Sequence, residues 1–330
     1  MTFSPPIGLR NPHVQTIFSS VGPRRMRVRS GFAKHLSAEQ PMILNCHDGI
    51  RLAGVFNQAG ESPASQLAIM IHGWEGSSGS SYMLSMSSRL LGAGIDVFRL
   101  NLRDHGETHH LNEGIFNSTL VPEVVSAIED LQARMRYSGY SLIGFSLGGN
   151  FALRVAVLAQ GRAIKLLKVI AFCPALNAGK SNVVLTARKN FVYEQYFVRK
   201  WKRSLHKKLE HFPHYGFGKS LAAMKTLDQM NKEFIPKYTA YDDVEEYFAA
   251  YAVTGDFLAK TICPCYLHFA KDDMIIPYQD VEQLADNPDL HITITEEGGH
   301  CGFLMNWKLD SWQDHRTLEL LSAPNNSPQV

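Results

Sequence analysis

Residues 140–159 read YSLIGFSLGGNFALRVAVLA, and the pentapeptide GFSLG at 144–148 joins a short apolar run to a longer helical pattern. A serine held on a sharp turn between a strand and a helix has strained backbone angles, so its neighbours two positions away must be small. The start of the helix also supplies backbone N–H groups and a positive dipole end where negative charge would develop. The turn therefore predicts that Ser146 is a nucleophile.

Short apolar runs alternate with helical patterns along most of the chain. The expected strands are Met42–Cys46, Arg51–Asn57, Leu67–Ile71, Asp96–Asn101, Tyr140–Gly144, Lys168–Cys173, Cys265–Ala270 and Leu290–Thr295. The expected helices are Tyr82–Leu91, Val121–Tyr137, Leu147–Ala159, Pro277–Ala285 and Asp310–Leu321. This alternation predicts an α/β fold with a mostly parallel sheet and helices on both of its faces. The first two runs are close together and alternate more, which favours an antiparallel hairpin at the edge.

The segment 175–262 breaks this alternation, because it is aromatic, basic and helical and has no convincing strand. We interpret it as a helical cap inserted into one discontinuous core made of residues 1–174 and 263–330. An apolar stripe recurs every four residues at Phe197, Trp201, Leu205 and Leu209. The basic residues of this helix are interpreted as a solvated face, with peripheral contact to a membrane surface as the alternative; they are Arg199, Lys200, Lys202, Arg203, Lys207 and Lys208.

A serine hydroxyl needs a base to remove its proton and a carboxylate to orient that base. His300 lies on the glycine-rich turn EGGHCG, just after the last expected strand. Asp272 and Asp273 follow the preceding strand, and neighbouring residues at a strand end point in opposite directions. Only one of the two should reach His300, and Asp273 is the better candidate. The chain order Ser146, Asp273, His300 is the one expected for α/β-hydrolases.

An oxyanion hole needs two N–H donors near the nucleophile. The amide of Leu147 should supply one of them. The loop HGWEGSS after the strand 67–71 should supply the other, through the amide of Trp74. His72 in this loop is expected to brace it rather than to act as the base. Cap aromatics such as Phe191, Tyr196 and Trp201 are candidates for lining the pocket.

The loop NLRDHGETHH at 101–110 supports a rival chemistry. His105 and His109 are four residues apart, so on a helix they would share one face and could hold a metal. The segment contains Gly106, follows a strand and offers no third ligand, so we expect a structural role at the pocket rim and no metal site. We also expect Arg103 and Asp104 to form an ion pair there.

Composition limits the remaining function classes. The chain has 330 residues, is 45% hydrophobic and carries a net charge of +2, which argues against disorder and against a dedicated nucleic-acid binder. We find no signal peptide and no run long enough for a transmembrane helix. The five cysteines are few and odd in number, so we expect packing roles and a cytoplasmic location. The Pro/Asn/Ser-rich tail after Ala323 is expected to be loose.

Together, the motifs HGxxG, GFSLGG, DDxxxP and GGHxGF resemble those of the α/β-hydrolase superfamily. The opening sequence GLRNPHVQT at 8–16 is similar to that of its YheT-like branch, which also includes membrane-anchored eukaryotic proteins. The resemblance implies a serine esterase that acts without a cofactor on short or medium acyl esters. The family's spacing to Pro277 also favours Asp273 over Asp272. Unlike its anchored relatives, the chain shows no N-terminal hydrophobic helix.

These observations predict a carboxylesterase that cleaves small-molecule or lipid-like esters through an acyl-enzyme. Two alternatives stay open. One is a protein of the same fold that binds a ligand without catalysis, since fold does not imply function. The other is an acyltransferase or thioesterase that uses the same nucleophile.

Overall fold

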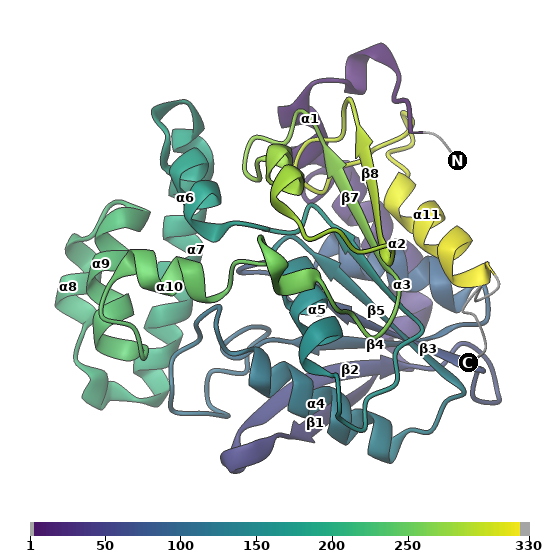
Figure 1. Cartoon of the computed structure of the whole chain (residues 1–330), viewed down its shortest axis with the longest axis horizontal. Coiled ribbons are helices and arrows are strands. Elements are labelled where there is room, and N and C mark those ends of the chain that lie inside the picture. The colour runs from purple at the N-terminus through teal and green to yellow at the C-terminus, as the bar shows by residue number, and fades with distance from the viewer. Residues whose placement is uncertain (1–2, 324–330) are drawn as a thin grey trace.

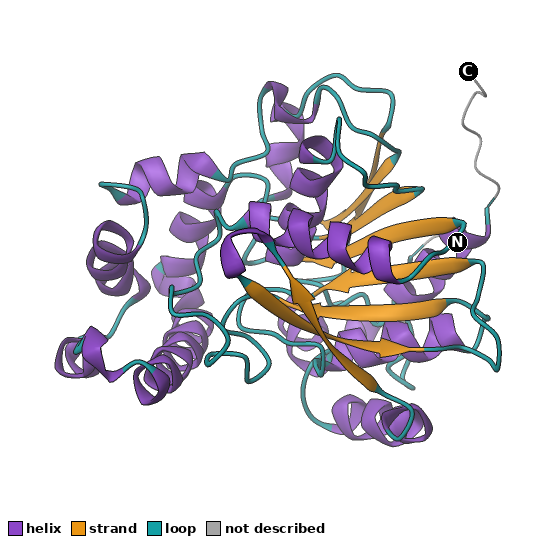
Figure 2. Ribbon diagram, turned by 90° about the horizontal axis from the view of Figure 1, so that it is seen from below, coloured by secondary structure: helices purple, strands orange, loops and turns teal. Residues whose placement is uncertain are grey.

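The computed structural model describes residues 3–323, so the tail expected to be loose lies, apart from Ala323, outside the described residues. An eight-stranded sheet forms its centre, in the order β1-β2-β4-β3-β5-β6-β7-β8 (Figure 2). The strands are β1 Gln40–Asn45, β2 Arg51–Asn57, β3 Gln66–Ile71, β4 Asp96–Asn101, β5 Gly139–Phe145, β6 Lys168–Phe172, β7 Cys265–Ala270 and β8 Leu290–Thr295. All eight predicted strands are therefore confirmed.

The sheet is parallel from β4 through β8, while β2 runs antiparallel to both of its neighbours. The tight turn between β1 and β2 contains Asp48 and Gly49, both with positive φ (57° and 72°). The predicted antiparallel hairpin at the sheet edge is confirmed. Strands β4, β5 and β6 are buried along their whole length, as expected where helices cover both faces.

Two hydrophobic clusters lie on opposite faces of the sheet. The first lies beneath α4 (Val121–Arg134) and α5 (Leu147–Leu158). The second lies beneath α2 (Pro23–Leu36), α3 (Ser81–Leu91) and α11 (Trp312–Ser322). Figure 1 shows the two groups of helices on the two sides of the strands. The expectation of helices on both faces is confirmed.

One predicted helix is wrong. The segment expected to be helical at Pro277–Ala285 contains only a 3₁₀ helix at Tyr278–Gln283. The carbonyl of Gln283 accepts a hydrogen bond from the Gly255 N–H (2.7 Å), and Gly255 also forms a parallel β-bridge with Leu284. These contacts hold the end of the segment in an extended conformation, so an α-helix cannot continue there.

Two N-terminal helices have no counterpart in the expectations. Helix α1 (Pro12–Phe18) begins at Pro12, and the Asn11 side chain caps it by accepting hydrogen bonds from the N–H groups of His13 and Val14. Helix α2 is largely basic and polar, yet its Phe32 is fully buried against the sheet. The position of α2 thus comes from tertiary contacts more than from its own periodicity.

The segment between β6 and β7 is helical, and it stands away from the sheet on the left in Figure 1. Between 175 and 262, all of it described, no strand occurs. Its α-helices are α6 Ala178–Thr186, α7 Phe191–His211, α8 Gly218–Ala223, α9 Leu227–Tyr238 and α10 Val244–Ala250. The apolar stripe of α7 packs inward, with Leu205 only 2% exposed.

The basic face of α7 is less solvated than its sequence suggests. The side chain of Lys208 is 1% exposed, and its ammonium donates to the Asp104 carboxylate (2.7 Å) and to the carbonyls of His109 and Asn112. Asp104 is thus paired with Lys208, and Arg103 pairs with Glu123. The expected ion pair between Arg103 and Asp104 is therefore wrong. Helix α7 contacts the loop after β4 with part of its basic face, and Lys208 pairs there with Asp104.

Candidate active site

Ser146 occupies the turn between β5 and α5, with φ 54° and ψ −119°. A Cβ atom added to Gly144 would lie 2.2 Å from the Gly148 carbonyl oxygen, and one added to Gly148 would lie 2.3 Å from that of Ile71. Both contacts are with backbone, so neither can be relieved by a side-chain movement. The two glycines are therefore required for the strand and helix to meet closely enough to hold Ser146 in this conformation.

Three side chains from separate parts of the chain form one hydrogen-bonded line. The Oγ of Ser146 lies 2.9 Å from the Nε2 of His300, and the Nδ1 of His300 lies 2.8 Å from the Asp273 carboxylate. A carboxylate only accepts, so Nδ1 carries a proton and the Nε2 of the neutral ring can accept the hydroxyl proton of Ser146. The sequence-predicted Ser146, Asp273 and His300 are thus brought together.

The two neighbouring aspartates have different partners. One oxygen of Asp273 faces His300, while the other accepts from the N–H groups of Ile275 and Ile276, at 2.8 and 3.0 Å. These bonds fix the orientation of the carboxylate. Asp272 points elsewhere and accepts from the Gly299 N–H (2.8 Å), so it holds the turn that carries His300.

The charge of His300 depends on opposing effects. Burial disfavours the protonated ring, but the neighbouring Asp273 carboxylate favours it through its charge and its hydrogen bond and raises the pKa of His300 to about 9. The imidazolium that would form after proton transfer is therefore well stabilised. The neutral ring, which is the form able to act as a base, becomes dominant only at alkaline pH.

The turn that carries His300 is held by the N-terminal segment. The Thr16 hydroxyl accepts from the His300 N–H (2.9 Å). The fully buried Gln15 amide accepts from the Leu304 N–H (2.6 Å) and donates to the carbonyls of Leu304 and Leu9. Sequence reasoning quoted these residues only as part of a resemblance and missed this positioning role. The only feature of the sequence that could have indicated this role is the polar residue Gln15 within the N-terminal motif GLRNPHVQT.

The loop after β3 lines the same cavity as Ser146 through Trp74. Within residues 3–323, neither the Trp74 N–H nor the Leu147 N–H has a hydrogen-bond acceptor, and both residues line the same cavity as Ser146. His72 is fully buried, with Nδ1 donating to the Gly73 carbonyl and Nε2 accepting from the Leu102 N–H. Burial lowers the pKa of His72 well below its ordinary value, so this neutral ring braces the loop as predicted.

The two histidines of the rim loop have unrelated partners. His105 donates from Nδ1 to the Arg103 carbonyl and accepts at Nε2 from the Glu75 N–H. His109 bonds the Ser204 hydroxyl of α7 (2.8 Å). Burial lowers the pKa of each ring to about 4. Both side chains are tied to the protein itself, and the loop connects the core to α7.

Two thiols lie beside His300, which sequence reasoning did not anticipate. The Cys301 N–H donates to the Cys173 sulfur (3.4 Å). Ligand atoms of Cys173, Cys301 and His300 lie within 4.8 Å of one another, the only cluster of this kind among the described residues. Both nitrogens of His300 are already bonded to Ser146 and Asp273, so a metal ion bound there would break that line.

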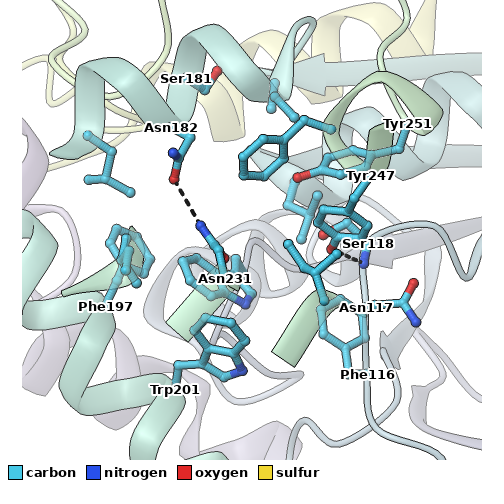
Figure 3. A pocket seen from close by; sticks show the side chains of 18 of the residues that line it. Phe116, Asn117, Ser118, Ser181, Asn182, Phe197, Trp201, Asn231, Tyr247 and Tyr251 are labelled. Carbon is cyan, nitrogen blue, oxygen red and sulfur yellow. Dashed lines mark hydrogen bonds between the residues drawn. The ribbon is translucent and has the colours of Figure 1, made fainter. Parts of the chain in front are cut away.

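A large apolar cavity opens next to Ser146 (Figure 3). It contains about 1030 Å³ of space free of atoms, part of it open to solvent. Trp201 lines it as expected, but Phe191 and Tyr196 do not, and their exposed fractions are 59% and 50%. Both side chains are exposed on α7, whereas the apolar stripe that contains Trp201 and Leu205 packs inward.

The chain is similar to known proteins of the α/β-hydrolase type. Residues 68–308 match the family described as "Alpha/beta hydrolase family". The Escherichia coli (strain K12) protein named "Putative esterase YheT" is 26% identical over 311 residues, covering 92% of this chain and 87% of that protein. A Dictyostelium discoideum "Abhydrolase domain-containing protein" is 22% identical over 332 residues, covering 98% of this chain and 81% of that protein.

A solved structure supports the same fold. The Pyrococcus furiosus esterase Pf2001 superimposes with a TM-score of 0.56 at 15% identity, covering 86% of this chain and 89% of that one. The family match spans most of the chain and includes the segments that carry Ser146, Asp273 and His300. The chain therefore belongs to the alpha/beta hydrolase family.

Proposed function

We propose that this hydrolase cleaves carboxylic esters through a covalent acyl-enzyme formed on Ser146. The observation that carries the proposal is the unbroken hydrogen-bonded line from Ser146 through His300 to Asp273, which ends at an apolar cavity. A nucleophile, a base and a group that orients the base are the three parts that acyl transfer to a serine needs.

The chemistry follows from the positions of these groups. His300 takes the hydroxyl proton as the Ser146 oxygen bonds to the ester carbonyl carbon, whose oxygen becomes negatively charged. The N–H groups of Leu147 and Trp74 stabilise that oxyanion, and Asp273 stabilises the imidazolium. The tetrahedral species collapses as His300 gives its proton to the departing alcohol. Water, deprotonated by His300, then attacks the acyl-enzyme, and the acid leaves as Ser146 regains its proton.

The helical segment 175–262 serves as the cap in this proposal. The core consists of residues 1–174 and 263–330, of which 324–330 lie outside the described residues. The cap contributes most of the apolar walls of the cavity, including Leu185, Trp201 and Phe234. The apolar lining of the cavity suits an acyl chain, and short to medium acyl groups are the finer substrate class that we propose.

Contact of the cap with a membrane surface, and a cytoplasmic location, stay predictions. In the described part of the chain, no helix has the length and apolar character needed to cross a bilayer. Part of the basic face of α7 is engaged by the core, since Lys200 donates to the Glu75 carbonyl and Lys208 is buried. Arg199 and Arg203 remain exposed on that helix.

The direct test replaces the nucleophile. We expect Ser146→Ala to lower turnover of p-nitrophenyl esters by about 10⁴- to 10⁶-fold without loss of fold, because the acyl-enzyme can no longer form. Circular dichroism and thermal denaturation verify the fold, and Ser37→Ala, at an exposed position, is the control. Unchanged ester hydrolysis by the Ser146→Ala variant would refute the proposal.

A fluorophosphonate probe and product analysis separate the alternatives. Labelling of Ser146 is expected for any of the acyl-transfer activities, whereas its absence would favour a protein that only binds ligand. Transfer of the acyl group to an added alcohol or thiol in preference to water would indicate an acyltransferase. Faster cleavage of thioesters than of matched oxygen esters would indicate a thioesterase.

A further inference from the structure

The apolar cavity contains one pair of amide side chains that face each other. The Nδ2 of Asn231 on α9 donates to the Oδ1 of Asn182 on α6, at 3.3 Å (Figure 3). Phe197 and Trp201 line the same region, and none of the lining side chains of this cavity carries a charge. A polar pair among aromatic and aliphatic walls is the usual means by which such a cavity fixes the orientation of a ligand.

This pair leaves hydrogen-bonding capacity unused. Each amide offers one oxygen acceptor and two N–H donors, and in the described part of the chain neither side chain has any other partner. Asn231 is only 9% exposed, so most of its side chain is enclosed by the protein. The oxygen and nitrogen of an amide side chain can be assigned in either orientation. If both amides were turned over, Asn182 would donate to Asn231, and one residue would again have a free N–H group and the other a free oxygen.

A hydroxyl group can bond either of these two free groups. Its oxygen can accept from the Asn182 amide, or its proton can be donated to the Asn231 oxygen. A carboxylate can only accept, so it has no use for the Asn231 oxygen, and the cavity lining supplies no positive charge to hold it. A hydrocarbon would leave both amides unpaired, at a cost of about 1–3 kcal/mol for each buried group.

We propose that Asn182 and Asn231 form a specificity subsite for a neutral hydroxyl on the apolar part of the substrate. The inference rests on the proposed function, because it places the ester carbonyl at Ser146 and the hydroxyl at the amide pair within one cavity. The hydroxyl can belong to the acyl group or to the alcohol. These two sources share the same chemistry, and the substrates distinguish them.

The test compares matched esters. One series consists of p-nitrophenyl esters of decanoic acid with a hydroxyl at successive carbons, and the other places the hydroxyl on the alcohol of a decanoate ester. In one series, at one position, we expect kcat/KM to exceed that of the unsubstituted ester by at least about tenfold, the effect of one well-placed hydrogen bond. The series in which the preference occurs identifies the source of the hydroxyl.

Substitution of the pair should remove this preference. Asn231→Leu and Asn182→Leu keep the approximate side-chain volume, so each should raise kcat/KM for the unsubstituted ester and bring the hydroxylated-to-plain ratio near unity. Lys232→Leu on the exposed side of α9 is the matched control and should keep the wild-type ratio. Hydrolysis of all esters without a preference at any position would overturn the subsite.

A binding measurement separates this inference from the proposed function. Terminally and internally hydroxylated decanoic acids and plain decanoic acid are titrated into the Ser146→Ala variant, and tryptophan fluorescence reports occupancy near Trp201. Tighter binding of a hydroxylated acid, abolished by adding Asn231→Leu, supports the subsite even if the wild-type protein hydrolyses no ester. Absence of both ester hydrolysis and preferential binding would overturn both proposals.

Discussion

The turn at Ser146 and the loop at His300 are organised in opposite ways. The turn is specified locally, because Gly144 and Gly148 and the adjoining strand and helix impose its conformation. The loop depends on distant residues, since the His300 N–H is held by Thr16, which lies 284 positions away. One half of the candidate site is thus built by neighbouring residues, and the other by contact between the two ends of the chain.

This difference explains why sequence patterns identify the turn at Ser146 in full and the loop at His300 only in part. A strand, a glycine-flanked serine and a helix are contiguous, so their residue types reveal the geometry. The glycine-rich turn around His300 reveals that a base could lie there, but not what holds it. The following predictions test whether this contrast between local and distant support holds.

The largest effect on the protein should come from a substitution in the turn at Ser146. Gly148→Ala would place a Cβ atom 2.3 Å from the Ile71 carbonyl oxygen and 2.4 Å from that of His72. The backbone of β3 cannot yield without disrupting the sheet, so we expect loss of folded protein, seen as insolubility or the absence of a thermal transition. Gly60→Ala is the control, because nothing lies within 4 Å of its added Cβ. A stable Gly148→Ala protein would contradict the account of the turn.

The next effect distinguishes the two neighbouring aspartates. Asp273→Asn removes the acceptor of the His300 Nδ1 proton and favours the wrong tautomer, so kcat should fall by about 10⁴-fold. Asp272→Asn keeps an oxygen that can accept from the Gly299 N–H and should lower kcat by less than about tenfold. Steady-state kinetics on one ester suffices, and equal losses would show that Asp273 is not the residue that orients His300.

The third prediction concerns pH. The Asp273 carboxylate outweighs burial and raises the pKa of His300 to about 9, and only the neutral ring can accept the Ser146 proton. We therefore expect kcat/KM to rise with pH, to reach half of its maximum near pH 9 and to level off above it, with a value at pH 7 about a hundredfold below the maximum. The pH profile of ester hydrolysis corrected for the spontaneous reaction tests this. An activity that is flat from pH 6 to 9 would contradict it.

The smallest effect on activity should come from the distant support. Gln15→Leu leaves the Leu304 N–H and the carbonyls of Leu9 and Leu304 unpaired, so the protein should lose about 2–4 kcal/mol of stability. The turn carrying His300 should loosen, which lowers kcat about tenfold with little change in KM and shifts the pH profile. The exposed Gln160→Leu is the control. A loss of stability with unchanged kcat and pH profile would assign Gln15 a structural role alone.

Several features of the fold were predictable because they depend on short stretches of sequence. The sheet strands are apolar runs bounded by turns, and α5 follows directly from the Ser146 turn. Helix α2 was missed because its contacts with α3 and the sheet, rather than its own basic sequence, hold it in place. The burial of Lys208 was missed because helical periodicity cannot show that a second surface, around Asp104, covers the charged side of α7.

The hydrogen bonds of Gln15 and Thr16 to the His300 loop also bear on when the site forms during folding. Closing a loop of 284 residues costs about 5 kcal/mol of chain entropy, which must be repaid by contacts made elsewhere. The sheet can therefore assemble and present Ser146 while His300 is still unplaced. During synthesis, we expect the contacts of Gln15 and Thr16 with this turn to form only after β8 and the turn itself have been made. Hydrolytic activity should thus appear last in refolding, after the secondary structure has formed, and it reports that the whole domain is complete.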